Sequence, residues 1–164
     1  MCKEKIEKSL QSNPYKVFRS LSMLEDNLED IAIMVLNDCE HHNLPFEIFE
    51  TGRTLARQEY LKSQGMSKTL KSKHLIDFDE DGNIIGKSKA FDIVLRYEHN
   101  GKETWSWANI GDDKQKARDL GMYKMMVEMV ASRYKTVKQK SLITRLVFGG
   151  QWSSFKDWPH IQAD

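Results

Sequence analysis

Apolar and polar positions alternate with two different periods along this chain. Between Ser22 and Asn43, apolar residues recur at steps of three and four, which predicts an amphipathic helix. Ser22 with Glu25 three residues later predicts a capping box at its start, and Asn43 and Pro45 are expected to end it. A second long helix is predicted over residues 112–134, with one apolar face formed by Leu120, Tyr123, Met126, Val127 and Val130.

Other segments have the two-residue period of β-strands, separated by turn residues. Strands or hairpins are predicted at 45–52, 74–86, 90–108 and 142–150, with a short helix at 53–65 and a polar loop at 66–74. The strongest of these is 90–108, where two β-rich runs flank the turn dipeptide Asn100-Gly101. Helices and hairpins in this order predict an α+β fold in which helices flank a small antiparallel sheet.

Composition narrows the class of protein. The 164 residues, 40% of them hydrophobic and 10% aromatic, are enough for one domain, which we expect to span residues 21–164 behind an N-terminal extension at 1–20. A net charge of +1 provides no basic field for a nucleic-acid partner. Cys2 and Cys39 are too few for a disulfide framework and fit a reducing compartment. No secretory signal or membrane span is predicted, and we expect a monomer without membrane insertion.

Three residues stand out as possible metal ligands, namely His74, Asp92 and His160. Asp92 interrupts the apolar strand segment 90–95 and is expected to face away from Phe91 and Ile93. A carboxylate on a partly apolar face needs a partner, a metal ion or a raised pKa. Two histidines and one carboxylate form a suitable catalytic zinc shell with an open fourth position for water. Because these residues lie far apart in the chain, scattered surface histidines and an Asp92 that faces the hairpin remain the alternative.

The C-terminal segment 149–164 combines Asp157, Trp158, Pro159 and His160. Asp157 and His160 are three residues apart, so a turn or a short bent strand would direct both side chains toward one point. Pro159 restricts φ immediately before His160, which suits a site that holds a side chain still. The alternative is a solvated turn that carries an aromatic plug.

These segments resemble the zinc peptidases of bacterial cell walls, the family of D-alanyl-D-alanine carboxypeptidases and phage L-alanyl-D-glutamate endopeptidases. The family pattern is matched by Ser72, His74, Asp92, Trp152, Asp157, Pro159 and His160. Upstream, Gly52-Arg53-Thr54 is similar to the family segment that precedes a helix carrying a Gln. The match covers residues 51–161, and the chain departs from it through an insertion at 77–89. The resemblance implies the Hedgehog/DD-peptidase-like zinc peptidase fold, with residues 21–164 as the catalytic domain.

The resemblance also implies a role for each matched residue. His74, Asp92 and His160 would bind one catalytic zinc ion, and Asp157 would be the general base. Arg53 would hold an anionic group of the substrate or steady the oxyanion, although a surface Arg at a helix start is an equal alternative. Smaller roles are expected for Ser72, as a hydrogen-bond partner of the substrate, and for Trp152, as packing below the metal loop or as a pocket wall.

Two alternatives concern the metal. Asp77, three residues after His74, is a rival zinc ligand, but Asp92 is preferred because a strand holds a ligand more rigidly. The acidic run Asp77–Gly82 resembles the start of a Ca²⁺ loop. Its twelfth position is Ser88 where such loops have Glu, so a plain turn is favoured.

The implied substrate is the peptidoglycan stem peptide. The dense C-terminal motif is most similar to the phage endolysin branch, which cuts between L-Ala and D-Glu. Such an enzyme would be made in the host cytoplasm without a signal peptide and would act on the cell wall after release, or would be carried in the virion. A D-alanyl-D-alanine carboxypeptidase is the nearest alternative. A non-catalytic, zinc-stabilised peptidoglycan-binding module is another, although such a module has no use for a general base.

Overall fold

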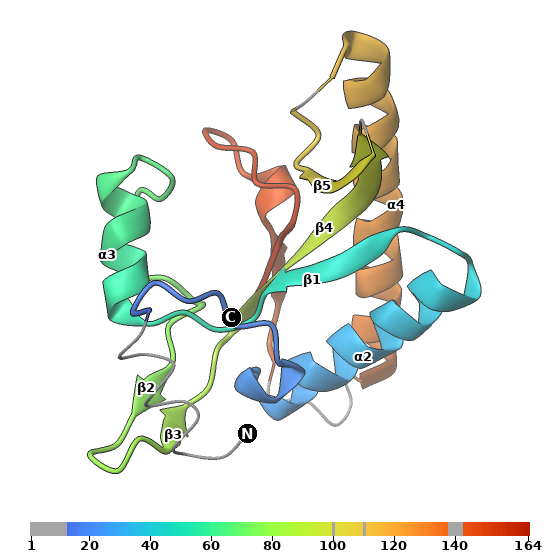
Figure 1. Ribbon diagram of the computed structural model, residues 1–164. Coiled ribbons are helices and arrows are strands. Elements are labelled where there is room, and N and C mark those ends of the chain that lie inside the picture. Colours follow the sequence, from blue (N-terminus) through green and yellow to red (C-terminus); the bar gives the residue numbers. More distant parts are fainter. Residues whose placement is uncertain (1–12, 100, 110, 138–142) are drawn as a thin grey trace.

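A five-stranded antiparallel sheet lies at the centre of the molecule (Figure 1). The computed structural model describes residues 13–99, 101–109, 111–137 and 143–164. Strands follow the order β1-β4-β7-β6, and β5 pairs with the outer half of β4. Their bounds are β1 Phe46–Glu50, β4 Ala90–His99, β5 Lys102–Ser106, β6 Leu146–Phe148 and β7 His160–Ala163. The α+β class with a small antiparallel sheet is therefore confirmed.

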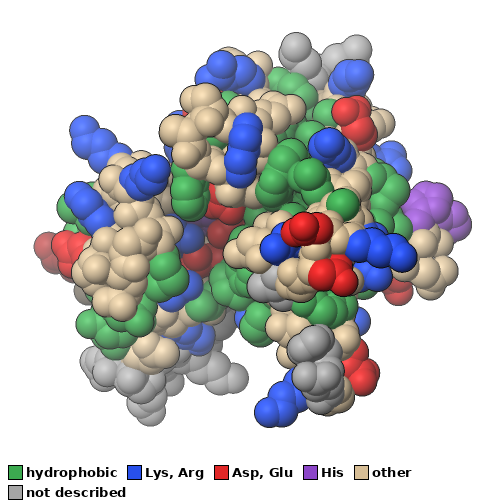
Figure 2. All heavy atoms as spheres, turned by 90° about the horizontal axis from the view of Figure 1, so that it is seen from above, with side chains coloured by type: hydrophobic (Ala, Val, Ile, Leu, Met, Phe, Trp, Pro, Cys, Tyr) green, Lys and Arg blue, Asp and Glu red, His purple; other side chains and the backbone are tan. Residues whose placement is uncertain are grey.

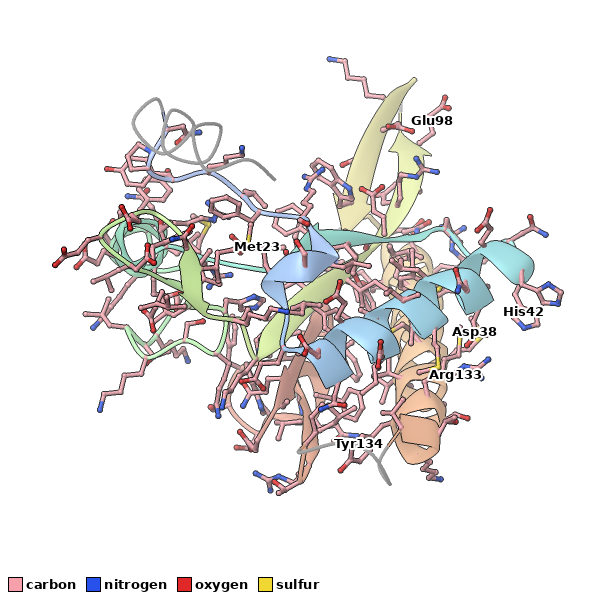
Figure 3. The ribbon with its side chains drawn as sticks, turned by 90° about the horizontal axis from the view of Figure 1, so that it is seen from below. Met23, Asp38, His42, Glu98, Arg133 and Tyr134 are labelled. Carbon is pink, nitrogen blue, oxygen red and sulfur yellow. The ribbon has the colours of Figure 1, made fainter. Side chains whose placement is uncertain are left out.

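One face of this sheet is covered by the two long helices, α2 (Asp26–His41) and α4 (Asp113–Val137). Alternation along β4 directs Phe91, Ile93 and Leu95 into the core between sheet and helices. Arg133 of α4 joins the helices by donating from Nε to Asp38 Oδ2 of α2 at 2.6 Å, and the two side chains point toward each other in Figure 3. The opposite face of the sheet is not covered by these two helices.

The start of the first helix differs from the prediction. Residues Leu21–Met23 form a 3-10 turn, and the α-helix begins only at Asp26. Between them the chain is extended, because Leu24 bridges to Ser88 and the Glu25 amide donates to the Ser88 carbonyl at 3.0 Å. The capping box expected at Ser22 and Glu25 is therefore wrong, since a long-range backbone contact holds the residues that would have formed it.

The predicted apolar face of the second long helix is correct except at one position. Tyr123, Met126, Val127 and Val130 are buried, but Leu120 is only half-buried. The fully buried residue is its neighbour Asp119. Its carboxylate accepts hydrogen bonds from Ser106 Oγ at 2.5 Å and from Gln115 Nε2 at 2.7 Å. Ser106 ends β5, and Gln115 lies one helical turn before Asp119. Their hydrogen bonds allow the Asp119 carboxylate to be buried, although helical periodicity alone would place it on the surface.

A smaller unit lies beside the sheet and contains helix α3 (Leu55–Ser63) and the hairpin β2 (Asp77–Phe78) and β3 (Ile84–Gly86). Phe18, Met23 and Ile76 form its separate apolar cluster. Residues 13–20 contribute to it, because Phe18 is buried and bridges to Gly52. None of the helices in the described ranges is long and apolar enough to cross a membrane.

Candidate metal centre and active-site cleft

The structure brings His74, Asp92 and His160 together from three separate segments. Asp92 on β4 and His160, the first residue of β7, are register partners on adjacent strands. His74 lies in the loop before β2, and its carbonyl accepts a hydrogen bond from the Arg53 amide at 2.8 Å. All three therefore depend on backbone pairing between elements far apart in the sequence.

Three side-chain atoms of this group form a nearly equilateral triangle. His74 Nε2 lies 3.1 Å from Asp92 Oδ1 and 3.1 Å from His160 Nδ1, and His160 Nδ1 lies 3.0 Å from Asp92 Oδ1. If both imidazoles donate a proton to Asp92, the contact between the two ring nitrogens places two donors together. Hydrogen bonds alone therefore cannot satisfy all three edges, whereas a cation shared by three lone pairs can.

A neighbouring residue orients His160. Its Nε2 donates to Gln162 Oε1 at 3.0 Å, and Gln162 lies two residues along β7, on the same face. This bond keeps a proton on Nε2, so that Nδ1, once it has lost its own proton, directs its lone pair into the triangle, as is usual for a metal-binding imidazole. His74 is fully buried, and its Nδ1 has no hydrogen-bond partner among the described residues. Packing rather than a second hydrogen bond therefore holds His74.

The electrostatics favour an ionised Asp92 between two different histidines. Burial raises the pKa of Asp92, but the charges and hydrogen bonds of His74 and His160 outweigh burial and hold it well below 3.8. Burial lowers the pKa of His74 and so favours its neutral form. Burial also disfavours the charged form of His160, yet its hydrogen bond to Asp92 and the charge of Asp92 raise its pKa above 6.5. His160 is thus the residue from which a binding metal ion would displace a proton.

The donor set fits a divalent ion of the zinc type. Two imidazole nitrogens and one carboxylate oxygen are common zinc ligands, and metal–ligand distances of about 2.0–2.1 Å put tetrahedral ligand atoms roughly 3.3 Å apart, close to the triangle's edges. Among the described residues, no other group of three His, Cys, Asp or Glu side chains meets in this way. Asp77, the rival carboxylate, lies exposed on β2 and outside the group.

The acidic run at Asp77–Gly82 forms a turn between β2 and β3. Asp79 Oδ1 accepts hydrogen bonds from the amides of Asp81 at 3.0 Å and Asn83 at 2.7 Å, and Asp79 Oδ2 accepts one from Asn83 Nδ2 at 2.9 Å. The carboxylate at the centre of the run thus closes its own turn, as a plain turn requires.

Asp157 lies beside the triangle because the C-terminal segment folds back onto Gly149. The Asp157 amide donates to the Gly149 carbonyl at 3.2 Å, and the His160 amide donates to the Asp157 carbonyl at 3.1 Å. A Cβ at position 149 would lie 2.4 Å from the Asp157 carbonyl oxygen, and one at Gly150 would lie 2.2 Å from the Trp158 ring. Two glycines are therefore needed for this close approach.

The carboxyl group of Asp157 has an unusual pKa. Burial and the negative charge of Asp92 raise this pKa from 3.8 to about 6, against the opposing charges of His160 and Arg53. A carboxyl group with a pKa near neutrality, beside the triangle of His74, Asp92 and His160 and not part of it, has the properties of a general base.

Arg53 belongs to a buried charge network and is not a surface residue. Glu50 Oε2 accepts from Arg53 Nε at 3.1 Å and is also bound by Arg53 Nη2, while Glu50 Oε1 pairs with Arg57. Arg53 Nη1 donates to Gln58 Oε1 at 2.8 Å, and Nη2 lies 3.7 Å from Asp92 Oδ2. These contacts hold the guanidinium beside the triangle of His74, Asp92 and His160.

A β-bulge places Glu50 in this network. The register of β1 against β4 shifts between Ile48 and Glu50, so that Glu50 pairs with Asp92 and shares its face of the sheet. Regular alternation would have directed Glu50 toward the helices instead. The sequence prediction missed Glu50, Arg57 and Gln162. Their only signal was position: Glu50 and Arg57 flank Arg53, and Gln162 follows His160 by two residues.

A cleft of about 920 Å³ opens above these groups. The predicted site residues Arg53, Ser72, His74, Asp92, Trp152, Asp157 and His160 all line it. Seen from above, Figure 2 shows a hollow between the α3 side and the rest of the molecule, with acidic side chains at its floor. The Trp152 ring lies 5.1 Å from that of His160, and Ser72 Oγ accepts from the His74 amide at 3.2 Å. Both contacts support the ligands, and both side chains also border the cleft.

Known proteins share this architecture, although no protein-family model matches the chain. The chain is 30% identical over 143 residues to the L-alanyl-D-glutamate peptidase of Listeria phage A118, a match that covers 87% of this chain and 39% of that protein. It thus spans about two fifths of that relative's length. Its fold is similar to the crystal structure of the Serratia marcescens L-Ala D-Glu endopeptidase ChiX, with a TM-score of 0.57, 22% identity and coverage of 94% of this chain and 95% of the other.

The chain has the fold of the Serratia marcescens L-Ala D-Glu endopeptidase. The resemblance indicated by the sequence motifs is confirmed by both comparisons. In this fold, the sheet face turned away from α2 and α4 carries Asp92 and His160, and α3 with its following loop forms the opposite side of the cleft.

Proposed function

We propose that this chain is a zinc-dependent peptidoglycan peptidase of the phage endolysin type, which hydrolyses the L-Ala–D-Glu bond of the stem peptide. The observation that carries the proposal is the triangle of His74, Asp92 and His160 with Asp157 beside it on the floor of an open cleft. The names of the phage relative and of the structural neighbour, both peptidases for this bond, support the same reaction.

Zinc held by His74, Asp92 and His160 would polarise the scissile carbonyl and activate water. The chain's own residues do the rest. The Asp157 carboxylate takes the proton of the attacking water and delivers it to the leaving amine of D-Glu. Arg53, which lines the cleft, would bind the anionic part of the substrate or the developing oxyanion, and Glu50 keeps its guanidinium in place.

The proposed action on the cell wall accords with the phage origin of the similar peptidase. The stem peptide is an extended chain with several carboxylates, and the open cleft beside α3 is suited to such a ligand. Release through the host membrane to reach the wall, or transport in the virion, would be supplied by other proteins.

Digestion of purified peptidoglycan followed by mass spectrometry tests the proposal. We expect new N-terminal D-Glu in the zinc-loaded protein's digest, and none with Asp157→Asn, the matched variant that lacks only the base. Release of free D-alanine without new D-Glu termini would instead identify a D-alanyl-D-alanine carboxypeptidase. Absence of both products with zinc bound would favour a non-catalytic peptidoglycan-binding module.

A further inference from the structure

Three aromatic side chains continue the cleft away from the metal-binding triangle. Phe49 of β1 packs edge-on against Trp105, with ring centroids 5.6 Å apart, and against Trp107, with centroids 5.2 Å apart. We call Phe49, Trp105 and Trp107 the aromatic wall. All three are half-buried, and Phe49 and Trp107 line the same cleft as the proposed metal ligands.

Polar residues fix the outer end of this wall and leave its inner end open to the cleft. Trp105 Nε1 donates to Glu47 Oε1, and the guanidinium carbon of Arg19 lies 5.4 Å from the Trp105 ring centroid and 5.6 Å from that of Phe49. Directly after Trp107, Ala108 has a φ of 58°, in the left-handed region that residues with a side chain seldom adopt. Contacts on its outer side thus hold the wall in place, and its members Phe49 and Trp107 line the substrate cleft.

One member of the wall, Phe49, lies close to Asp92 in the sheet. Phe49 directly precedes Glu50, whose Cα is the register partner of the Asp92 Cα. With strands roughly 4.8 Å apart and successive Cα atoms 3.8 Å apart, the backbone of Phe49 lies roughly 6 Å from that of Asp92. In peptidoglycan, one L-Ala residue and one lactyl group separate the L-Ala–D-Glu bond from the muramic acid ring. This spacer is comparable to two residues, or roughly 7 Å when extended.

Charged and uncharged side chains come from different elements around the cleft, in a distribution that suits the same substrate. The loop that follows α3 lines the cleft with Lys68, Lys71 and Lys73. Arg53 and Arg57 also line it, but both pair with Glu50, so the lysines supply most of the positive charge. From β1 and from the segment after β5, the uncharged residues Phe49, Trp107 and Asn109 also line the cleft. The part of the stem after the cut is rich in carboxylates, and the part before it is L-Ala attached to an uncharged N-acetylated sugar. The lysines therefore suit the anionic stem, and the aromatic residues suit the sugar.

We propose that the aromatic wall is a glycan subsite, in which Trp107 stacks against the muramic acid ring that carries the peptide to be cut. The inference rests on the proposed function, because the position of the sugar follows from the bond that is hydrolysed. The apolar C–H face of a pyranose packs on the large rigid area of Trp107. The exposed amide of Asn109 lies at the same edge of the cleft, where it can bond the N-acetyl group.

Two substrates that differ only in the sugar test the subsite. One is a MurNAc-linked stem peptide, and the other is the same peptide with its L-Ala simply N-acetylated, so that both present an amide before L-Ala. We expect the native protein to have a kcat/KM about tenfold or more higher for the muramyl substrate than for the acetylated peptide. Roughly 60 Å² of apolar contact with the sugar is enough for a difference of this size. Trp107→Ala should abolish this preference and leave cleavage of the acetylated peptide within about twofold. Trp107→Phe should restore part of the preference.

Ile85→Ala is the matched control, because it removes an exposed apolar side chain on β3, away from the cleft, and should leave both rates unchanged. Equal losses on both substrates in Trp107→Ala, or no preference in the native protein, would overturn the glycan subsite while the peptidase activity stands. Binding of the free GlcNAc–MurNAc disaccharide tests the subsite independently of cleavage. It is measured for the Asp157→Asn variant and for the double variant that also carries Trp107→Ala. If the disaccharide binds only when Trp107 is present, and the native protein cleaves neither substrate, the subsite is supported and the proposed reaction is refuted. If the disaccharide does not bind, or binds equally without Trp107, the subsite is refuted.

Discussion

Replacing Asp157 by Asn should make the metal-free protein more stable while it destroys the proposed activity. The pKa of Asp157 is about 6 in the folded protein, compared with 3.8 for an unperturbed carboxyl group, a rise of roughly 2. Each pKa unit corresponds to 1.36 kcal/mol, so ionisation of Asp157 costs the fold up to about 3 kcal/mol at pH 8. Because the side chain is partly exposed and solvent screens its charge, we expect Asp157→Asn to raise the free energy of unfolding by about 1–3 kcal/mol.

The sign of this effect makes it depend on pH in a specific way. The folded state holds the Asp157 proton more tightly than the unfolded state does, so this group favours folding below about pH 4 and loses that contribution as the pH rises through about 6. The stability gain of Asp157→Asn should therefore be largest at pH 8 and should disappear toward pH 4. Catalysis should depend on the same group, with kcat/KM of the zinc-loaded enzyme falling as Asp157 becomes protonated, at a pH below about 6 because the positive charge of zinc lowers its pKa.

Urea denaturation of EDTA-treated protein from pH 4 to pH 8 measures the stability term, and turnover of a stem peptide after zinc loading measures the catalytic term. A gain of 1–3 kcal/mol corresponds to a rise of roughly 2–10 °C in Tm for a domain of this size. The rate should fall by about 10²–10⁴-fold at least. Asp77→Asn, which neutralises an exposed carboxylate outside the cleft, should change neither. A stability gain that is absent at pH 8, or equal at every pH, would refute the electrostatic reasoning, and a near-native rate would remove Asp157 from the mechanism.

Further predictions concern the metal ligands and their supports. His74→Ala and Asp92→Ala should lose bound zinc in elemental analysis, whereas Asp77→Ala should retain it; the reverse result for the two carboxylates would reassign the ligand. Gln162→Ala should weaken zinc binding by about 10–100-fold in competition with a chelator, because His160 loses the bond that fixes its tautomer, and unchanged affinity would show that the bond is incidental. Arg53→Lys should raise KM or lower kcat in steady-state assays, since a point charge cannot replace a forked donor, and native kinetics would exclude Arg53 from substrate binding.

Local patterns were sufficient for most elements of the fold. The two long helices, the hairpins at 74–86 and 90–108 and the short helix that begins after Thr54 are present, because their apolar spacing and turn residues act over a few neighbours. The prediction failed where a distant residue intervened. Ser88 holds Leu24 and Glu25 in an extended conformation, and Ser106 and Gln115 allow Asp119 to be buried in place of Leu120.

The candidate site shows the same division. His74, Asp92, Asp157 and His160 were recognisable because residue types and short motifs marked them, and the structure brings all four to one cleft. Glu50 could not be recognised, because its orientation toward the cleft depends on a bulge in the pairing of β1 with β4.

By itself, the sequence determined the periodicity of the elements, the residues capable of metal and acid–base chemistry, and the two glycines that let the C-terminal segment fold back. These properties belong to single residues and their near neighbours. Only the tertiary structure decided that Asp92 and His160, 68 residues apart, become register partners, and that Phe49 and Trp107 meet beside them. The reason is that strand register and burial are set jointly by residues from distant parts of the chain. Those same contacts raise the pKa of Asp157 and orient the His160 ring toward His74 and Asp92.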